Sequence, residues 1–599
     1  MGRSICAALA AGSLLGSALA ADVLSFSVDD APNNASAAID PSFAGLGIEP
    51  SQLYYYMGGA ETNQFSINLL NNLANFTGQP PYIRLGGNTQ DYMIYSASND
   101  EWIIKNNPNS TGQGHIASDS MLIGPHFFDA ANRLPQGTPV TWGLNLAYEE
   151  DDYIDQIVAT AQQIKDRCTN INLRSFEIGN EPDVYLDNGF RKGTWTGTQY
   201  NNEWTERAAA IYKQVLEPKG VSSNFFDAAA TTAWVSGTTF GVQGLVSEGI
   251  DDKVSGSSNS YLGSWDQHDY YYFLGATGYP ITLDYMLQLD TTETQFNSAL
   301  GPQLTEAKAT DYPYALREMG VVGPIGLAGV SDTFAAGLWT MNFLLYAASQ
   351  NISSVQFHMT AESNTSAWKP TDEGGVQPFV RPIYYGMAAF DQTIGASCNA
   401  TVAPASINSY PDGYNGYVKA YAVYQGAGLG SIVVINGKLA NVSASDKPSL
   451  TVEVTLPTSL AGQTVHLSYL TGDGADATKG TTWNGLSFEQ NGDGTQSQVS
   501  DDDKTLTVGK TGNLSITVRD TEAIVASFRN KIGADTSSDG DACSAIVTKG
   551  LGATATASAG SAKSTGTADN DDDSGAARLG SASSVAVLVF AFAVTVWLA

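Results

Sequence analysis

The chain has 599 residues, of which 29 are basic and 60 are acidic, and its formal net charge is −31. This length exceeds what one compact core holds, so we expect two domains with additional segments. Nucleic-acid binding needs clustered lysine and arginine, and the acidic excess argues against that class of function. Hydrophobic residues make up 43% of the chain, as expected for a folded protein.

The N-terminus has the pattern of a secretory signal peptide. Residues 1–20 contain a basic Arg3, an apolar stretch and the small-residue cleavage pattern Ala18-Leu19-Ala20. A secreted chain passes through the compartment where asparagine glycosylation occurs, and the sequence has eight acceptor triplets. The predicted glycosylation sites are Asn34, Asn75, Asn109, Asn351, Asn364, Asn399, Asn441 and Asn513.

Residues 44–393 alternate short apolar strands with longer helical patterns. Two of the helical patterns cover 151–167 and 331–350, the second more apolar and therefore expected to be more buried. Eight strand–helix units of this kind predict a (β/α)₈ TIM barrel, whereas a doubly wound sheet would carry a glycine-rich phosphate loop that no strand here precedes. The predicted strands are 44–49, 82–86, 139–146, 173–179, 225–232, 264–272, 312–318 and 353–359.

Residues 394–530 have short β-rich segments separated by glycine, aspartate and asparagine turns, which predicts an antiparallel β-sandwich. The N-terminal segment 21–43 contains a strand at 23–28 that we expect to join this sandwich. Cys398 and Cys543 flank the sandwich, and we expect a disulfide between them, with Cys168 buried and free. The predicted sandwich strands are 417–423, 431–435, 450–456, 464–469, 505–508 and 514–518.

The C-terminal part has two further segments. Residues 531–574 form a low-complexity stalk rich in Ser, Thr and Asp. Residues 575–599 contain a short spacer and a terminal apolar tail, the pattern of a glycosylphosphatidylinositol (GPI) anchor signal with attachment at Ser574 or Gly575. The tail is shorter than the roughly 20 residues of a membrane-spanning helix, which makes a transmembrane anchor the less favoured alternative. We therefore expect a secreted protein anchored at the cell surface.

In a TIM barrel, reactive side chains lie at the C-terminal ends of the strands. Glu181 follows the fourth predicted strand and Glu318 ends the seventh, and two such carboxylates are typical of glycoside hydrolases. The alternative for Glu318 is a structural salt bridge with Arg317. With few histidines and three mature cysteines, the chain is expected to need no metal or cofactor. The strand-end residues are Glu49, Arg84, Asn145, Asn180, Glu181, His268, Tyr270, Glu318 and His358.

Five blocks of the chain resemble glycoside hydrolase family 79, which contains β-glucuronidases and heparanases. The resemblance covers roughly residues 23–530 and implies a (β/α)₈ barrel followed by a β-sandwich. The blocks match the family's second, third, fourth and sixth strands and the region after the eighth. They are YIRLGGNTQDY at 82–92, WGLN at 142–145, EIGNEPD at 177–183, WDQHDY at 265–270 and RPIYYG at 381–386.

The resemblance also implies roles for individual residues. Glu181 would be the acid/base and Glu318 the nucleophile of a retaining reaction, with Arg84 beneath Glu318 keeping it ionised. Asn180 would bind the 2-hydroxyl of the sugar and Tyr270 would orient the nucleophile. The other expected substrate-binding residues are Glu49, His268 and Asn88.

These features predict a retaining exo-β-glucuronidase that removes terminal glucuronate or 4-O-methylglucuronate from extracellular glycans or glucuronides. So acidic a protein lacks basic patches for a polyanionic chain, which favours exo over endo cleavage. A β-glycosidase for a neutral sugar and an inactive, wall-anchored glycan-binding protein remain alternatives. The expected partners are a carbohydrate substrate and, through the lipid anchor, a membrane; nucleic acid is not expected, and a monomer is favoured.

Overall fold

The computed structural model describes most of the predicted domains but neither terminal signal. The predicted signal peptide, nearly all of the stalk and the anchor signal with Ser574 and Gly575 lie outside the described residues. In the part that is described, no helix combines the length and the apolar character required to cross a membrane. The described residues are 23–372, 375–501, 503–528, 530–533 and 543.

Eight parallel strands close into a barrel, in the order β10-β11-β12-β2-β3-β7-β8-β9. Every strand predicted between residues 44 and 359 is present, which confirms the predicted barrel. Every residue of β2, β7, β9 and β12 is buried, as expected for a sheet that is covered on both faces. The strands are β2 (Ala44–Ile48), β3 (Ile83–Leu85), β7 (Pro139–Leu144), β8 (Asn172–Ile178), β9 (Phe226–Thr231), β10 (Leu262–Phe273), β11 (Tyr314–Gly323) and β12 (Val355–Met359).

Strand β11 is longer than predicted. The sequence placed its end at Glu318, but the strand continues to Gly323, and all ten of its residues are buried. The reason is that β10 is also long, and the two strands stay paired as far as the Phe273–Gly323 pair. Its last printed pair with β12 is Met319 with Phe357. Glu318 therefore lies in the middle of its strand but close to the level at which the neighbouring strand β12 ends.

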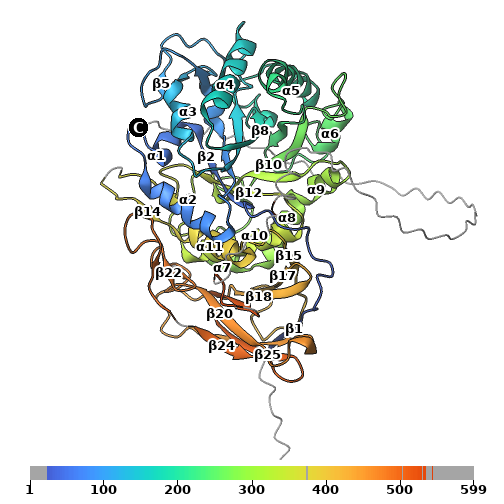
Figure 1. Cartoon of the computed structure of the whole chain (residues 1–599), viewed down its shortest axis with the longest axis vertical. Helices are drawn as coiled ribbons and strands as arrows, with labels where there is room; N and C mark the ends of the chain where they lie inside the picture. The colour runs from blue at the N-terminus through green and yellow to red at the C-terminus, as the bar shows by residue number, and fades with distance from the viewer. Residues whose placement is uncertain (1–22, 373–374, 502, 529, 534–542, 544–599) are drawn as a thin grey trace, which may run out of the picture.

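Helices surround the barrel (Figure 1). The two predicted helical patterns correspond to α4 and α10, and all residues of α10 except the last are buried. The helices are α1 (Leu53–Met57), α2 (Gln64–Thr77), α3 (Pro125–Ala131), α4 (Tyr153–Arg167), α5 (Gly197–Ile211), α6 (Val242–Ser247), α7 (Leu283–Leu287), α8 (Asp290–Ala299), α9 (Gly301–Lys308), α10 (Phe334–Ser349) and α11 (Pro382–Ile394).

Helix α10 is apolar all round because it is packed on two sides. Figure 1 shows α10 and α11 between the barrel and the orange strands of the C-terminal domain. The amide of Phe334 donates to the carbonyl of Ala477, and the hydroxyl of Tyr421 donates to Asn342 Oδ1 at 2.9 Å. A helix covered on every side has no solvent-facing stripe, so its sequence lacks the usual amphipathic alternation.

The C-terminal domain consists of two β-sheets. One sheet has the order β16-β1-β19-β25 and the other contains β15, β17, β18, β26, β20, β21, β22, β23 and β24. The N-terminal strand β1 pairs with β19 and β16, which confirms that the segment 21–43 contributes a strand to this domain. Strand β26, which the sequence reading missed, lies between β18 and β20 and is fully buried.

The strands of the two sheets are β1 (Leu24–Ser27), β15 (Ala400–Pro404), β16 (Ile407–Ser409), β17 (Val418–Gln425), β18 (Gly428–Asn436), β19 (Ser449–Thr455), β20 (Thr464–Thr471), β21 (Thr482–Trp483), β22 (Leu486–Ser487), β23 (Ser497–Gln498), β24 (Lys504–Thr507), β25 (Asn513–Arg519) and β26 (Glu522–Ser527). Smaller ladders pair β4 (Met93–Tyr95) and β5 (Lys105–Asn106) with β6 (Met121–Ile123), and β13 (Trp368–Lys369) with β14 (Phe379–Val380).

The cysteines take the places expected from the sequence. Cys398 and Cys543 form a disulfide with Cα atoms 5.0 Å apart. Cys168 is free and buried, and burial raises the pKa of its thiol to about 12. Of the predicted glycosylation sites, five asparagines are exposed, and Asn364, Asn399 and Asn441 are partly buried.

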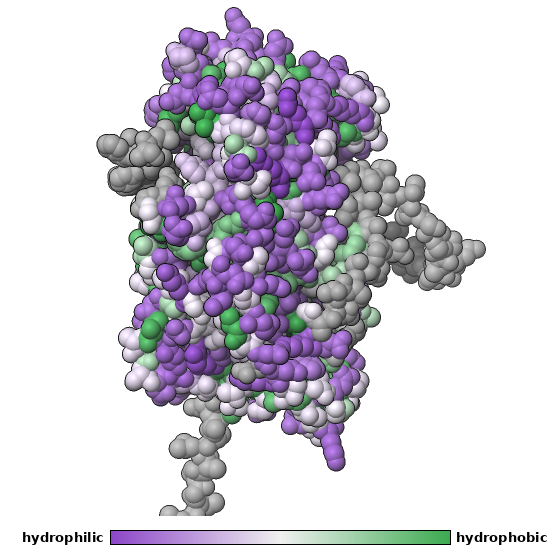
Figure 2. All heavy atoms as spheres, turned by 60° about the vertical axis from the view of Figure 1, so that its left-hand side comes forward, coloured by the Kyte–Doolittle hydropathy of each residue, from purple (hydrophilic) through white to green (hydrophobic). Residues whose placement is uncertain are grey.

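The surface face in Figure 2 is mostly hydrophilic, with hydrophobic residues in small groups. This agrees with the strongly acidic composition of the chain and with a protein that stays soluble.

Candidate active site

A tight turn after β8 presents Glu181 at the barrel mouth. Gly179 has φ +85°, and a Cβ atom there would come within 2.8 Å of Leu146 and of the Tyr185 hydroxyl. Glu181 itself has φ +48°, an uncommon conformation for a residue with a side chain. Its amide donates to the carbonyl of Ala230 at 2.8 Å, which links the turn to the end of β9. Backbone strain of this kind is often kept at functional sites.

Glu318 faces the same mouth and is held in its ionised form. The hydroxyl of Tyr270 donates to its Oε1 at 2.8 Å, and Arg84 Nη1 donates to its Oε2 at 2.6 Å. Burial alone would raise the pKa of Glu318, but His358, His268, Arg84 and the Tyr270 hydrogen bond together lower it well below its usual value. A carboxylate that stays ionised is suited to act as a nucleophile.

The alternative of a structural pair between Glu318 and its neighbour Arg317 is wrong. Arg317 pairs with Asp227 instead, with Nε 3.1 Å from Oδ2, and its Nη1 donates to the Ser354 hydroxyl at 2.9 Å. The pairing of β11 with β10 is irregular here, passing from Gln267–Leu316 to His268–Glu318, and Arg317 and Glu318 contact different partners. Glu318 pairs with Arg84 instead, as the family resemblance implied.

His268 lies between the two glutamates. Its Nδ1 is 3.2 Å from Glu181 Oε1 and 3.9 Å from Glu318 Oε2. The nearest oxygens of Glu181 and Glu318 are within 4.8 Å of each other. Retaining glycosidases hold their carboxyl groups about 5–5.5 Å apart, whereas inverting enzymes need about 6.5–9.5 Å to admit a water molecule. The separation therefore fits a retaining reaction.

Arg84 is fully buried and is the centre of a hydrogen-bond network below these glutamates. It donates to Glu177 from Nε at 3.0 Å and from Nη2 at 2.6 Å, and Nη2 also reaches Asn180 Oδ1 at 2.8 Å. Asn180 Nδ2 donates in turn to Asn88 Oδ1 at 3.0 Å. This fixes the amide of Asn180 next to Glu181, in the position from which the family resemblance expects it to bind the sugar.

Glu49 and His358 occupy the opposite part of the mouth. Glu49 Oε1 accepts a hydrogen bond from the amide of Thr89 at 2.8 Å and another from its hydroxyl. His358 Nε2 is 3.6 Å from Glu49 and its Nδ1 is 3.6 Å from Glu318. Burial lowers the pKa of His358, but the two carboxylates outweigh burial and raise it, so His358 is favoured as a cation. The predicted contact of Glu49 with ring hydroxyls stays a prediction.

The sequence reading did not single out Asp91, which organises the back of the site. Asp91 is buried and accepts hydrogen bonds from the amides of Leu146 and Asn180 and from the Tyr185 hydroxyl, at 3.0, 2.9 and 2.6 Å. Burial raises its pKa to about 6 in spite of these bonds. Its only sequence signal was its position inside the block 82–92 that resembles the family.

A second missed feature is the pair formed by Glu177 and Asp266. Burial and the charge of Glu177 raise the pKa of Asp266 well above its usual value. Burial acts in the same direction on Glu177, but Arg84 and a hydrogen bond with Asp266 lower its pKa overall. A protonated Asp266 thus donates to an ionised Glu177. The Glu177–Asp266 pair therefore carries one negative charge, which Glu177 uses to hold Arg84 in place.

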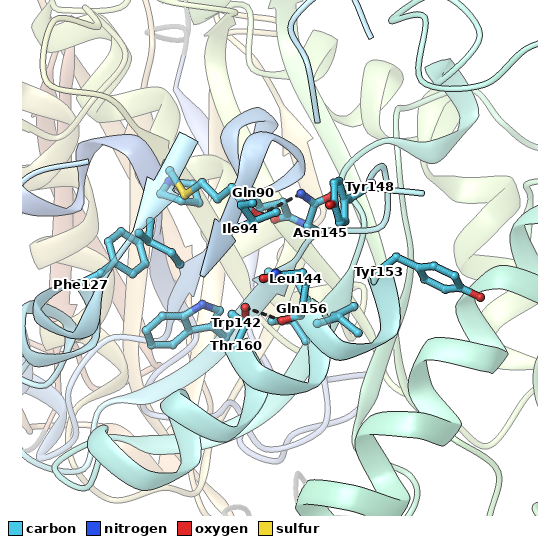
Figure 3. A pocket seen from close by; sticks show the side chains of 15 residues that line it. Gln90, Ile94, Phe127, Trp142, Leu144, Asn145, Tyr148, Tyr153, Gln156 and Thr160 are labelled. Atoms are coloured by element: carbon cyan, nitrogen blue, oxygen red, sulfur yellow. Dashed lines mark hydrogen bonds between the residues drawn. The ribbon is translucent and has the colours of Figure 1, made fainter. Parts of the chain in front are cut away.

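Other residues with candidate roles lie away from the glutamates. The side-chain amide of Asn145 donates to the carbonyls of Met93 and Ser118 at 3.0 and 2.7 Å, so it holds loops together. Figure 3 shows Asn145 beside a small pocket between β7 and α4, which Trp142 and Gln156 also line. This pocket is on the outer side of the barrel strand.

Most of the Tyr54–Tyr56 cluster packs against the core. Tyr56 is fully buried against Trp368, and Tyr54 packs edge-on against Trp102 and Phe127. Lys369, on the connection that follows β12, is buried and paired with Glu362. These contacts do not place the tyrosines or Lys369 at Glu181 or Glu318.

Two sets of three side chains in the described residues bring possible metal-ligand atoms within 4.8 Å of one another. They are Glu177, Asp266 and His268, and Glu181, His268 and Glu318. Their carboxylates already contact Arg84, Tyr270, His268 or each other, as described above. We therefore assign both sets to the network around the two glutamates.

Comparisons with known proteins agree with this geometry. The model for the "Glycosyl hydrolase family 79 C-terminal beta domain" matches residues 420–525. A β-glucuronidase of Aspergillus niger is 28% identical over 483 residues, covering 76% of this chain and 84% of that protein. A β-glucuronidase of Neurospora crassa is 27% identical over 518 residues, with 79% and 89% covered.

Solved structures share the fold. A 4-O-α-L-rhamnosyl-β-D-glucuronidase from Fusarium oxysporum superposes with a TM-score of 0.68 at 21% identity, covering 84% of this chain and all of that chain. A GH51 arabinofuranosidase from Xanthomonas axonopodis pv. citri superposes with a TM-score of 0.56 at 13% identity, covering 85% of this chain and all of that chain. The match to the family 79 C-terminal domain and the two β-glucuronidase relatives, together with the barrel and the sandwich, support membership of the chain in glycoside hydrolase family 79.

Proposed function

We propose that the protein is a retaining exo-β-glucuronidase that removes a terminal β-linked glucuronate from a glycan or glucuronide. The observation that carries the proposal is the pair of glutamates on either side of His268, with oxygens within 4.8 Å and with Glu318 held ionised. The two curated relatives, both β-glucuronidases, point to glucuronate as the sugar.

The first step breaks the glycosidic bond. Glu318 attacks the anomeric carbon, while the protonated Glu181 gives its proton to the departing oxygen. The products are a covalent ester between glucuronate and Glu318, the free alcohol, and an ionised Glu181. Tyr270 and Arg84 keep the attacking carboxylate in one orientation through their hydrogen bonds to its two oxygens.

The second step releases the sugar. Glu181, now a base, takes a proton from a water molecule whose oxygen attacks the anomeric carbon. Glucuronate leaves with the configuration it had in the substrate, and both glutamates return to their starting protonation states. His268 Nδ1 is near both carboxylates, so it remains close to the charged glutamate in both steps.

Hydrolysis of aryl β-glucuronide, compared with aryl glycosides of neutral sugars, tests the sugar. We expect turnover with the glucuronide and little with the β-galactoside, β-xyloside or β-glucoside. A preference for a neutral sugar would replace the proposal by the neutral β-glycosidase. Binding without turnover of any glycoside would favour an inactive glycan-binding protein.

Substitution of each glutamate tests the roles. A 2-fluoro-glucuronide should label Glu318 covalently in the unsubstituted enzyme. Glu318→Ala should lose labelling, and Glu181→Ala should keep it when the leaving group needs no proton. Full activity of either variant on aryl β-glucuronide would contradict the mechanism.

We further propose that the enzyme works outside the cell, attached through a glycolipid at Ser574 or Gly575. The signal-peptide and tail patterns of the sequence support this proposal. A phospholipase specific for phosphatidylinositol should release the enzyme from intact cells. Retention of the enzyme on treated cells, with release only by detergent, would favour the transmembrane alternative.

A further inference from the structure

Most of the exposed large hydrophobic side chains belong to the barrel domain. Of the nine in the described residues, six are on connections that follow barrel strands, Phe273 is the last residue of β10, and the other two, Val442 and Val499, are in the sandwich domain. The six are Tyr55, Ile103, Leu186, Trp234, Ile325 and Val376. These connections begin at the end of the barrel that holds the two glutamates.

Trp234 stands out among them because it is 63% exposed and has φ +69°. A bulky residue in the left-handed region is under strain, and a large exposed ring gains little from burial to offset it. Within the part of the chain that the structure describes, no other aromatic ring is stacked on Trp234. Packing within the described residues therefore does not account for the exposed ring, and we consider a ligand as its partner.

The loop that carries Trp234 is bonded to the segment of the acid/base. The carbonyl of Ala230 accepts from the amide of Glu181 at 2.8 Å. The amide of Thr232 donates to Asp183 Oδ1 at 3.1 Å, and its hydroxyl also donates to that carboxylate. Trp234 follows Thr232 by two residues, and Asp183, the hydrogen-bond partner of Thr232, follows Glu181 by two residues.

A second contact ties this loop to the strand of His268. Gln267 Nε2 donates to the carbonyl of Thr232 at 3.1 Å. Leu186, which is 45% exposed, follows Glu181 on the segment that faces this loop. Trp234 and Leu186 are therefore both on the Glu181 side of the mouth, whereas Phe273, 5.9 Å from the ring of Tyr270, is on the side of Glu318.

We propose that Trp234, together with Leu186 on the same side of the mouth, forms the platform that binds the ring attached to the departing oxygen. This inference rests on the proposed function, because it is Glu181 that protonates that oxygen. The glucuronate ring must lie over Glu318, so the ring on the other side of the bond comes to the Glu181 side. The platform selects the leaving group and takes no part in the chemistry.

The chemistry of an indole face defines what it binds. Its surface is apolar and carries negative electron density, so it suits the C–H face of a neutral sugar or an aryl ring and disfavours an anionic ring. The net charge of −31 acts in the same direction. The expected leaving group is a neutral ring with a flat apolar face.

Three substrates separate the leaving group from the glucuronate. β-Glucuronyl fluoride has no ring on the leaving side, 4-nitrophenyl β-glucuronide has an aryl ring, and a glucuronosyl-β-hexose disaccharide has a neutral sugar ring. We expect Trp234→Ala to lower kcat/KM about tenfold for at least one ring-bearing substrate and to change it less than twofold for the fluoride. Loss with the aryl compound alone indicates an aryl aglycone, and loss with the disaccharide alone indicates a sugar.

Two further variants complete the test. Trp234→Phe keeps a ring and should recover most of the lost kcat/KM. Ile325→Ala removes an equally exposed side chain, 62% exposed, from the connection after the Glu318 strand, and it should leave all three substrates unaffected.

Two results overturn the inference: equal loss with the fluoride and the ring-bearing substrates, or no loss with any of them. Failure of the unsubstituted enzyme to hydrolyse the fluoride would instead refute the proposed function, and the inference with it.

Discussion

Replacement of Tyr270 by phenylalanine tests how the structure controls the nucleophile. The change removes one hydroxyl and leaves the ring, its packing against Phe273 and the other contacts of Glu318. The lost interaction is the 2.8 Å hydrogen bond to Glu318 Oε1. A hydrogen bond to a charged group contributes about 1.5–3 kcal/mol.

The sign of the effect follows from the protonation state that the bond favours. Tyr270 donates to the ionised carboxylate, so its loss raises the pKa of Glu318 toward the usual range. At about 1.4 kcal/mol for each tenfold change in ionisation, the acid limb of kcat/KM should move upward by about one to two pH units. The rate at low pH should fall more than the rate near neutrality.

The assay is the pH dependence of kcat/KM for aryl β-glucuronide, which reports ionisations of the free enzyme. Tyr271→Phe is the matched control, because Tyr271 is the next residue of the same strand and its hydroxyl contacts Thr291 instead of a glutamate. It should leave the acid limb unchanged. An unchanged acid limb and rate in Tyr270→Phe would refute the role given to this hydrogen bond.

Three other changes have defined outcomes. Asp91→Asn replaces an oxygen that accepts backbone N–H groups, including that of Asn180, with a donor, so kcat/KM should fall about tenfold while far-UV circular dichroism is kept; unchanged kinetics would show that the contact has no influence on the site. Cys398→Ser, Cys543→Ser and the double variant should each lower the free energy of unfolding in denaturant by about 2–5 kcal/mol, because each change removes the same disulfide. A loss in the double variant equal to the sum of the two single losses would contradict this. Asp391 is buried in α11, and burial raises its pKa well above the ordinary value of 3.8. The buried carboxyl therefore does not destabilise the fold below pH 3.8, and the loss of stability grows as the pH rises above that value. Asp391→Asn should show a smaller fall in Tm between pH 4 and pH 7 than the unsubstituted enzyme, and parallel Tm curves would contradict the raised pKa.

Local patterns were sufficient for much of the architecture. Each barrel strand is a short apolar run between helical patterns, and that signal is encoded in neighbouring residues. The same is true of Glu181, because the apolar run of β8 followed by Asn180 and Pro182 marks both the strand end and the turn. Strand β26 was missed since the turn that separates it from β25 consists only of Asp520 and Thr521 and contains no glycine or proline.

The strand end at Glu318 was misplaced for a different reason. How far β11 extends depends on its pairing with β10, and strand pairing is a property of two distant segments. The alternative pairing of Glu318 with Arg317 likewise looked reasonable from adjacency alone, although Asp227 of β9 pairs with Arg317 and Arg84 of β3 pairs with Glu318.

The sequence by itself determined the number and order of the barrel strands, the second domain, the identities of the two glutamates and, through its resemblance to family 79, their expected roles. Closure of the barrel decided what those residues can do. Only the folded chain brings Arg84 from β3, Glu177 from β8 and Glu318 from β11 into one buried network. The pKa of Glu318 depends on burial and on charges from several strands that are distant in the sequence, and its distance from Glu181 depends on how those strands pack. Both are determined only when the strands come together.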